Sequence, residues 1–337
     1  MKVQAQLYHP LQDKAVQCTA CSHRCRIREG KRGVCGIRKN EDGDLYLLVY
    51  GKASALNTDP IEKKPLYHFY PGMRIFSFGT VGCNFRCDFC QNAELSQFHK
   101  EHDEPTLMKT GRDFFPESIV EYCRQENIPA IAFTYNEPAI FFEYAYDTAQ
   151  LAHEKGLKTV YISNGFETRE ALEKLSPYLD ALNIDLKSSR KEFYQRICGG
   201  QIEPVKENIQ WCVEAGIWTE VTTLVIPDQN DSDEELEDVA EFLYEISPDI
   251  PWHISAYHPC FRMTQPPTPS ETLERAYEIG KTAGLNYVYV GNFFDSTHEN
   301  TFCPQCENLV VERSGYEVKN FLKKDQCPHC RAKISGR

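Results

Sequence analysis

The chain has 337 residues, of which 41% are hydrophobic, and a formal net charge of −12 at pH 7. A chain of this length can bury one large core, and it contains no run of about 18 apolar residues, which a membrane-spanning helix requires. The acidic balance argues against a broad nucleic-acid-binding surface. The N-terminus lacks the basic and then apolar layout of a signal peptide, so we expect a cytoplasmic protein that binds neither membranes nor nucleic acid.

Cysteine is the most informative residue type in the chain, which contains 15 of them. A reducing compartment disfavours disulfides, so tight groups of cysteines indicate metal sites. Three such groups occur, near residues 18–35, 83–90 and 303–330. The remaining cysteines stand alone, and we expect them to be small buried apolar residues; they are Cys123, Cys198, Cys212 and Cys260.

The first predicted unit, residues 1–50, is a Cys-rich metal-binding segment. Its candidate ligands have C-x2-C-x3-C-x9-C spacing and are Cys18, Cys21, Cys25 and Cys35. Nine Lys and Arg against two acidic residues give residues 1–40 a charge of +7, which would offset the negative charge of thiolates on a metal. Zinc is the simpler expectation for this site, and an auxiliary iron–sulfur cluster is the alternative.

The second predicted unit, residues 51–300, alternates short β-rich runs with longer runs of helical pattern. This alternation is typical of βαβ units and a parallel sheet. The expected strands are Arg74–Gly79, Ala130–Thr134, Lys158–Ser163, Ala181–Asp185, Trp218–Val225 and Trp252–Tyr257. The expected helices include Pro116–Gln125, Ala139–Glu154, Glu234–Ile246 and Thr272–Ala283. Six such units predict an α/β fold, a partial (β/α)6 barrel.

In such barrels the chemistry lies where the strands end and the βα loops begin. The loop after the first expected strand carries Cys83, Cys87 and Cys90 in C-x3-C-x2-C spacing. Three thiolates leave one iron of a [4Fe–4S] cubane without a protein ligand, free to bind another molecule. A zinc site that borrows a remote ligand and a ferredoxin-like cluster with a distant fourth cysteine are the alternatives.

This motif, with Phe89 directly before the last cysteine, closely resembles that of the radical S-adenosylmethionine (SAM) superfamily. In that superfamily the amine and carboxylate of SAM chelate the open iron, and reductive cleavage of SAM yields methionine and a 5′-deoxyadenosyl radical. The resemblance therefore implies a radical SAM barrel with a [4Fe–4S] cluster and SAM as cofactors. It also implies an electron donor of the flavodoxin or ferredoxin type.

The resemblance also implies SAM contacts at Phe89 in the cysteine loop and at the ends of the other strands. Glu137 stands where the superfamily has the acid that receives the amino group of SAM, with Tyr135 and Asn136 in place of two glycines. The remaining contacts resemble residues near SAM in glycyl-radical activating enzymes such as the pyruvate formate-lyase activating enzyme; they are Ser163, Asn164, Asp185, Lys187 and His258.

The last predicted unit, residues 301–337, contains two C-x2-C knuckles separated by 20 residues. Their cysteines are Cys303, Cys306, Cys327 and Cys330. Four thiolates at this spacing predict a zinc ribbon, in which the closed metal site replaces the core that so short a segment lacks. A rubredoxin-like iron site is the alternative, because iron and zinc compete for the same ligands.

The resemblance to one family covers nearly the whole chain. The runs Asp59–Phe69, Phe133–Pro138 and Tyr287–Asn292, with both flanking cysteine sets, resemble the AmmeMemoRadiSam-system radical SAM enzyme. That family is related to glycyl-radical enzyme activases and is named for the homologues of the Memo and AMMECR proteins whose genes accompany it. The resemblance therefore implies Memo-like and AMMECR-like proteins as partners.

Together these features predict a radical SAM enzyme that abstracts hydrogen, with a partner protein as substrate. Modification of an RNA or of a small molecule is the alternative within catalysis. A non-catalytic iron–sulfur or zinc scaffold that binds partners is the alternative from another class. The open iron and the polar residues at the barrel mouth favour the enzyme, because a scaffold needs neither.

Overall fold

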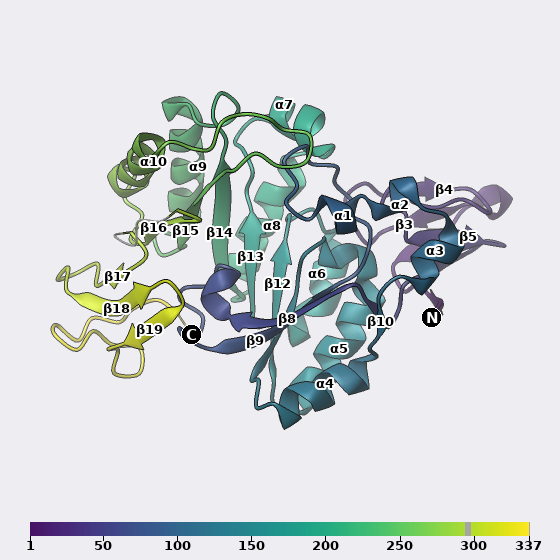
Figure 1. The fold of residues 1–337 in the computed structure, drawn as a ribbon, viewed down its shortest axis with the longest axis horizontal. Coiled ribbons are helices and arrows are strands. Elements are labelled where there is room, and N and C mark those ends of the chain that lie inside the picture. The colour runs from purple at the N-terminus through teal and green to yellow at the C-terminus, as the bar shows by residue number, and fades with distance from the viewer. Residues whose placement is uncertain (294–297, 337) are drawn as a thin grey trace.

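The computed structural model describes residues 1–293 and 298–336 and has one large sheet at its centre (Figure 1). The strand order of this sheet is β16-β15-β14-β13-β12-β11-β9-β8. All of its strands run parallel except β8 (Ala55–Pro60), which pairs antiparallel with β9 at one edge. The parallel strands are β9 (Arg74–Gly79), β11 (Ala130–Phe133), β12 (Lys158–Ser163), β13 (Ala181–Asp185), β14 (Trp218–Val225), β15 (Trp252–Ala256) and β16 (Val288–Gly291).

The predicted α/β fold with a parallel sheet is confirmed, and all six expected strands lie in the sheet within one residue of their expected ends. Two further strands, β8 and β16, extend it at its two edges. β8 was not predicted, because it contains Asn57, Asp59 and Pro60, which are typical of loops. The carboxylate of Asp59 is satisfied locally, since it accepts hydrogen bonds from Lys63 (3.1 Å) and Lys64 (3.0 Å).

Amphipathic helices follow the strands and bury their apolar faces against the sheet. In α9 (Asp233–Ile246) the buried residues Leu236, Val239 and Leu243 recur at helical spacing. Ser232 caps its first turn, because its side chain accepts a hydrogen bond from the Glu235 N–H. The other long helices are α4 (Pro116–Gln125), α5 (Phe142–Glu154), α6 (Arg169–Leu175), α8 (Glu203–Glu214) and α10 (Ser270–Thr282). The shorter ones are α1 (Ala93–Ser96), α2 (Phe98–Glu101), α3 (Glu104–Lys109) and α7 (Lys191–Phe193).

The N-terminal segment forms two small antiparallel sheets that pack on the main body. Their strands are β1 (Val3–Gln4), β2 (Tyr8–Pro10), β3 (Val16–Cys18), β4 (Arg26–Ile27), β5 (Arg38–Glu41) and β6 (Asp44–Leu47). A buried ion pair joins this segment to α5, because Arg38 contacts Glu143 at 2.6 Å and both side chains are 2% exposed. Arg38 Nε also donates to the Ile140 carbonyl oxygen (2.8 Å), and Glu143 Oε1 accepts from the Gln6 N–H (2.8 Å), so each member of the pair has a further hydrogen-bond partner.

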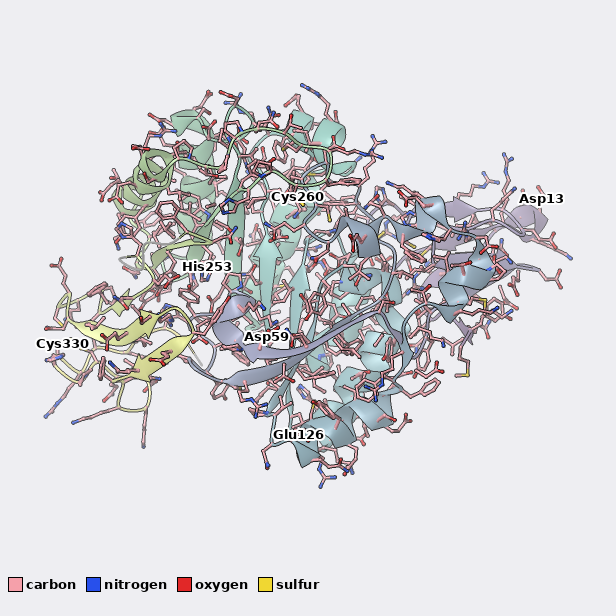
Figure 2. The ribbon with its side chains drawn as sticks, viewed as in Figure 1. Asp13, Asp59, Glu126, His253, Cys260 and Cys330 are labelled. Atoms are coloured by element: carbon pink, nitrogen blue, oxygen red, sulfur yellow. The ribbon has the colours of Figure 1, made fainter. Side chains whose placement is uncertain are left out.

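The C-terminal segment forms a third small sheet from β17 (Thr301–Phe302), β18 (Leu309–Ser314) and β19 (Glu317–Asn320). It packs at the N-terminal ends of the barrel strands, where His68 contacts the Ser335 carbonyl oxygen and the Tyr289 hydroxyl, each at 2.6 Å. In Figure 2, His253 near the start of β15 lies on the side of this segment, and Cys260 beyond the end of β15 lies away from it. The C-terminal sheet therefore covers the end of the barrel opposite the βα loops.

Across the described residues, no helix combines the length and the apolar composition that crossing a bilayer requires.

Candidate active site

The cysteine loop begins where β9 and β11 approach each other closely. A Cβ atom at Gly79 would lie 2.3 Å from the Thr134 carbonyl oxygen, so only glycine fits there. The side chain of Asn136 then fixes the start of the loop. Its Nδ2 donates to Thr80 Oγ1 (3.0 Å) and to the Gly82 carbonyl oxygen (2.9 Å), and its Oδ1 accepts from the Thr80 N–H (3.2 Å). Asn136 thus positions the loop with all of its amide groups paired.

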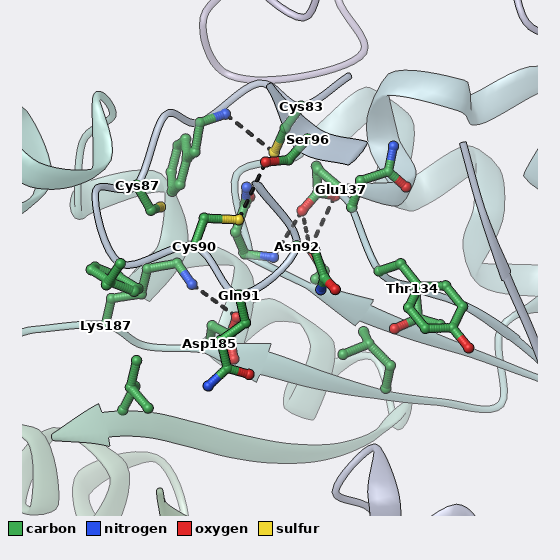
Figure 3. A pocket seen from close by; sticks show the side chains of 18 of the residues that line it. Cys83, Cys87, Cys90, Gln91, Asn92, Ser96, Thr134, Glu137, Asp185 and Lys187 are labelled. Atoms are coloured by element: carbon green, nitrogen blue, oxygen red, sulfur yellow. Dashed lines mark hydrogen bonds and ion pairs between the residues drawn. The ribbon is translucent and has the colours of Figure 1, made fainter. Parts of the chain in front are cut away.

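The thiols of Cys83, Cys87 and Cys90 line one cavity of about 260 Å³ at the carboxyl ends of the strands (Figure 3). Two of the sulfurs have polar neighbours: the Phe85 N–H donates to Cys83 Sγ (3.4 Å), and Ser96 Oγ lies 3.2 Å from Cys90 Sγ. Three thiols that open on one cavity, with hydrogen-bond donors beside them, fit an iron–sulfur cluster with three protein ligands.

A buried carboxylate lines the same cavity. Glu137, which is 2% exposed, accepts hydrogen bonds from the N–H groups of Ala139 (3.0 Å) and Asn164 (2.8 Å). Ser163 Oγ lies 3.1 Å from Glu137 Oε2 and 2.6 Å from Oε1 of a second buried acid, Glu167. Burial, and then the neighbouring Glu167, raise the pKa of Glu137 well above its usual range. Burial likewise raises the pKa of Glu167.

An ion pair lies across the cavity from the carboxylates. Lys187 Nζ donates to Asp185 Oδ2 (2.8 Å) and lies 5.6 Å from the centre of the Phe89 ring. Burial lowers the pKa of Lys187, but Asp185, Cys87 and Cys198 together outweigh burial, and the pKa is raised well above the ordinary value. The Lys187 main chain is held on both sides, because its N–H donates to the Tyr194 hydroxyl (3.0 Å) and its carbonyl oxygen accepts from Asn230 (2.7 Å).

The structure brings the expected cysteines together with all but one of the expected SAM contacts. The expected residues that line the cavity are Cys83, Cys87, Phe89, Cys90, Tyr135, Asn136, Glu137, Ser163, Asn164, Asp185 and Lys187. His258 is not among the residues that line it. Its side chain is exposed, and Nε2 contacts the Asn292 carbonyl oxygen at 3.3 Å. The expected contact between His258 and SAM therefore stays a prediction.

Sequence reasoning missed several residues around this cavity. Thr222 and Leu224 from β14 and Ser255 from β15 line it, but in sequence they are ordinary strand residues without a motif. Cys198, expected to be an isolated apolar residue, is buried beside the cysteine loop, where its carbonyl oxygen accepts from the Arg86 N–H (2.8 Å). Glu167 was also missed, although an acidic residue shortly after Ser163 and Asn164 was a usable signal.

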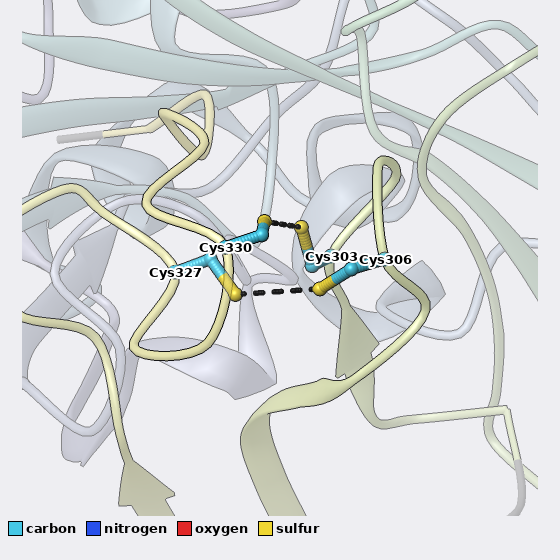
Figure 4. Close-up of side chains that lie close together, drawn as sticks. All are labelled: Cys303, Cys306, Cys327 and Cys330. Carbon is cyan, nitrogen blue, oxygen red and sulfur yellow. Dashed lines mark hydrogen bonds between the residues drawn. The ribbon is translucent and has the colours of Figure 1, made fainter.

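The C-terminal cysteines form a compact four-sulfur site (Figure 4). The sulfur atoms of Cys303 and Cys330 lie 3.6 Å apart, as do those of Cys306 and Cys327. Tetrahedral zinc with Zn–S bonds of about 2.3 Å separates its sulfur ligands by about 3.8 Å. The site therefore fits zinc or a single iron, and it lies at the end of the barrel opposite the three-cysteine cavity.

The N-terminal cysteines also come together. They line a second cavity, on the side of the cysteine loop that faces the N-terminal segment. Three of them are buried and Cys25 is partly exposed. The main chains of Cys21 and Glu167 form an antiparallel β-bridge, so the N-terminal cysteine segment lies directly against the stretch that carries Glu167.

Comparisons with known proteins agree with this geometry. Residues 78–243 match the sequence profile of the Radical SAM superfamily. An uncharacterized protein of Methanocaldococcus jannaschii is 41% identical over 336 residues, which cover 98% of this chain and 98% of that protein. A protein of the same organism named as a glycyl-radical enzyme activating enzyme is 28% identical over 247 residues, covering 69% of this chain and 93% of that protein.

Among solved structures, Streptococcus suis SuiB bound to S-adenosylmethionine has a TM-score of 0.50 and 15% identity, over 67% of this chain and 52% of that chain. This likeness shows a shared fold. The family match covers the cysteine loop and every other residue that lines the cavity except Ser255. The chain therefore belongs to the radical SAM superfamily of enzymes, whose members bind a [4Fe–4S] cluster and SAM.

Proposed function

We propose that this protein is an activase-like radical SAM enzyme, which cleaves SAM reductively and abstracts a hydrogen atom from a partner protein. The observation that carries the proposal is the meeting of the three-cysteine loop, the buried Glu137 and the Asp185–Lys187 pair on one cavity. When bound by Cys83, Cys87 and Cys90, the cluster supplies the electron that breaks a carbon–sulfur bond of SAM. The protein supplies binding and orientation.

In this proposal different cavity residues contact different parts of SAM. Glu137 receives the ammonium group of SAM as a charge-assisted hydrogen bond, which needs Glu137 in its anionic form. Ser163 and Asn164 hold the Glu137 carboxylate in place through the hydrogen bonds given above. Lys187 keeps its positive charge beside Asp185, and this pair provides polar contacts on the opposite wall of the cavity. Phe89 and Tyr135 provide the apolar surface of the site.

The activase-like reaction is supported by relatives named as glycyl-radical enzyme activating enzymes, of which one aligns over 69% of this chain. We further propose that the protein is the radical SAM member of an AmmeMemoRadiSam system and that its partners are Memo-like and AMMECR-like proteins. We place it in the cytoplasm, because oxygen-sensitive clusters and its unpaired cysteines suit a reducing compartment.

An external electron donor of the flavodoxin or ferredoxin type completes the proposal. A cavity of about 590 Å³ opens on the outer side of the cysteine loop, lined by Cys83 and by the cations of Arg86 and Lys100. A donor with an acidic surface would dock there, close to the first cysteine. Such docking is steered by charge, so reduction of the cluster by the protein donor should slow more steeply as salt rises than reduction by dithionite, a small anion.

The test is anaerobic incubation of the reconstituted protein with reductant, SAM and each candidate partner, followed by mass spectrometry of all products. The expected result is 5′-deoxyadenosine formation without a partner and a faster rate with one partner protein, which gains a radical or a modification. If only an RNA or a small molecule stimulates 5′-deoxyadenosine formation, the substrate belongs to that class and is not a protein. No 5′-deoxyadenosine under any condition would overturn the proposal.

A further inference from the structure

We propose that Cys18, Cys21, Cys25 and Cys35 hold a second iron–sulfur cluster and not the zinc ion that their spacing first suggests. The four side chains reach one cavity from four places in the N-terminal segment, and His23, Arg38 and Asn84 line it with them. This proposal is independent of the reaction at the first cluster, because it concerns only which metal the N-terminal set binds.

The spacing of the sulfur atoms separates the two kinds of cysteine site in this protein. In residues 1–293 and 298–336, the C-terminal cysteines are the group whose sulfurs all lie within 4.8 Å of one another, as a single tetrahedral ion requires. The N-terminal sulfurs do not gather so closely within that described part, and neither do those of the three-cysteine loop. Ligands of a cluster bind different irons with sulfides between them, so their sulfurs stand farther apart. The N-terminal set is arranged like the cluster site.

A buried hydrogen-bond donor beside this cavity also supports an iron–sulfur cluster. Asn84 is 1% exposed, and its Oδ1 accepts a hydrogen bond from Asn164 Nδ2 (2.8 Å). Its Nδ2 is buried with no hydrogen-bond partner among the described residues. A buried amide donor without a partner is unfavourable, so this group is expected to have a ligand. The sulfides and thiolates of a cluster accept such N–H groups, and these bonds tune its potential.

The position of the cavity suits a second cluster that transfers electrons to the first one. Asn84 directly follows Cys83, and His23 Nε2 contacts the Asn84 carbonyl oxygen at 2.9 Å. The N-terminal segment also touches the loop at Gly82, where a Cβ atom would lie 2.5 Å from the Cys35 carbonyl oxygen. A cluster here would lie behind the first one, with one loop residue between the two sites. It could take one electron from a flavodoxin-type or ferredoxin-type donor and deliver that electron to the first cluster.

The decisive experiment leaves the N-terminal cysteines intact and removes the other cluster. The full-length triple variant Cys83→Ala, Cys87→Ala and Cys90→Ala is reconstituted anaerobically with iron and sulfide, next to the wild type. Iron, acid-labile sulfide and zinc are then measured per chain. We expect the triple variant to keep roughly half of the wild-type sulfide, with about one zinc ion from the C-terminal site. Sulfide is the key readout, because neither zinc nor a single iron on four thiolates needs it.

Sulfide at background in the triple variant, with about two zinc ions per chain, would overturn the proposal. A second comparison assigns the retained cluster to its ligands. Adding Cys18→Ser and Cys21→Ser to the triple variant should remove the remaining sulfide, whereas adding Cys123→Ala, at a buried cysteine outside all three groups, should not. Retention of sulfide in the first of these would also overturn the assignment. Zinc bound at the C-terminal site and the far-ultraviolet circular dichroism show that each variant is folded.

Discussion

Glu137 and Glu167 share the hydroxyl group of Ser163, although 29 residues of the chain separate the two acids. A serine hydroxyl has one proton to donate, and the Gly165 N–H already donates to its oxygen (2.8 Å). The second carboxyl contact is favourable when that carboxyl is protonated and donates to Ser163. This arrangement is favourable when the two acids share one proton, and the raised pKa values of both acids agree with it.

The shared proton predicts a pH dependence of SAM binding. Glu137 binds an ammonium group only as an anion, and its pKa is raised, so the affinity should increase as the pH rises through that pKa. Glu167→Gln keeps the shape of the pair but removes the charge that opposes ionisation of Glu137. We expect the midpoint of the SAM-affinity profile, measured by calorimetry, to move to lower pH.

The control for this shift is Glu170→Gln. Glu170 lies three residues away on α6, half-exposed, and pairs with Arg24 at 2.8 Å instead of with the buried acids. This variant should keep the wild-type midpoint. Identical profiles for Glu167→Gln and the wild type would show that the two carboxyls titrate independently.

Glu137→Gln should keep the cluster and weaken SAM binding. The charge-assisted hydrogen bond to the ammonium group becomes a neutral one, which costs up to about 3 kcal/mol of binding free energy. Iron analysis and equilibrium binding of SAM measure the two effects separately. Glu126→Gln, at an exposed position beyond the end of α4 (Figure 2), is the matched control and should change neither. An unchanged dissociation constant in Glu137→Gln would remove this residue from the SAM site.

Asn136→Ala should destabilise the cysteine loop. The substitution removes three hydrogen bonds and leaves the buried N–H of Thr80 unpaired, so we expect the free energy of unfolding to fall by about 1–3 kcal/mol. We also expect iron to be lost faster on exposure to a chelator. Asn136→Asp keeps the acceptor for Thr80 and should show a smaller loss. Denaturant unfolding that does not distinguish Asn136→Ala from the wild type would contradict this role.

Loss of the C-terminal metal should lower stability without stopping SAM cleavage. Cys327→Ser combined with Cys330→Ser removes two of the four ligands, and the segment has little other core to hold it. We expect about one zinc ion fewer per chain and a lower melting temperature, with iron content and 5′-deoxyadenosine formation retained below the transition. If the cleavage is lost at temperatures where the variant stays folded, this segment contributes to the catalytic end.

The sequence predicts the central strands well, because β11 to β15 are mostly apolar and β-branched and are largely buried on both faces, with Asn183, Glu220 and His253 as buried polar exceptions. The cavity residues could be predicted as a set for a related reason: the ends of parallel strands meet at one edge, so motifs at those ends converge. Glu167 had only its position shortly after Ser163 and Asn164 as a signal, and local sequence carried no comparable sign for Asn84. Glu167 lies beside Glu137, and Asn84 lines the cavity of the N-terminal cysteines, only because distant parts of the chain pack together.

The choice between metals at the N-terminus also lay beyond the sequence. Four cysteines within a short segment suit zinc and iron–sulfur clusters equally, because both use the same thiolates. The distinction rests on how far apart the folded chain holds the sulfurs and on what lies beside them. Arg38, Asn84 and His23 reach that cavity from three different parts of the chain.

The contacts of the C-terminal sheet make the barrel asymmetric from end to end. In the described residues, no strand pairing joins β16 to β8 or β9, so the sheet is open along one side. At the base, His68 from the β8–β9 connection and Tyr289 from β16 are bonded to each other and packed under the C-terminal segment, which ties the two edges together. At the mouth, the loop after β15 contacts the cysteine loop that follows β9, because the Arg262 N–H donates to the Asp88 carbonyl oxygen (2.9 Å). The open side of the sheet is thus bridged at both ends, by the C-terminal segment at the base and by the loop after β15 at the mouth.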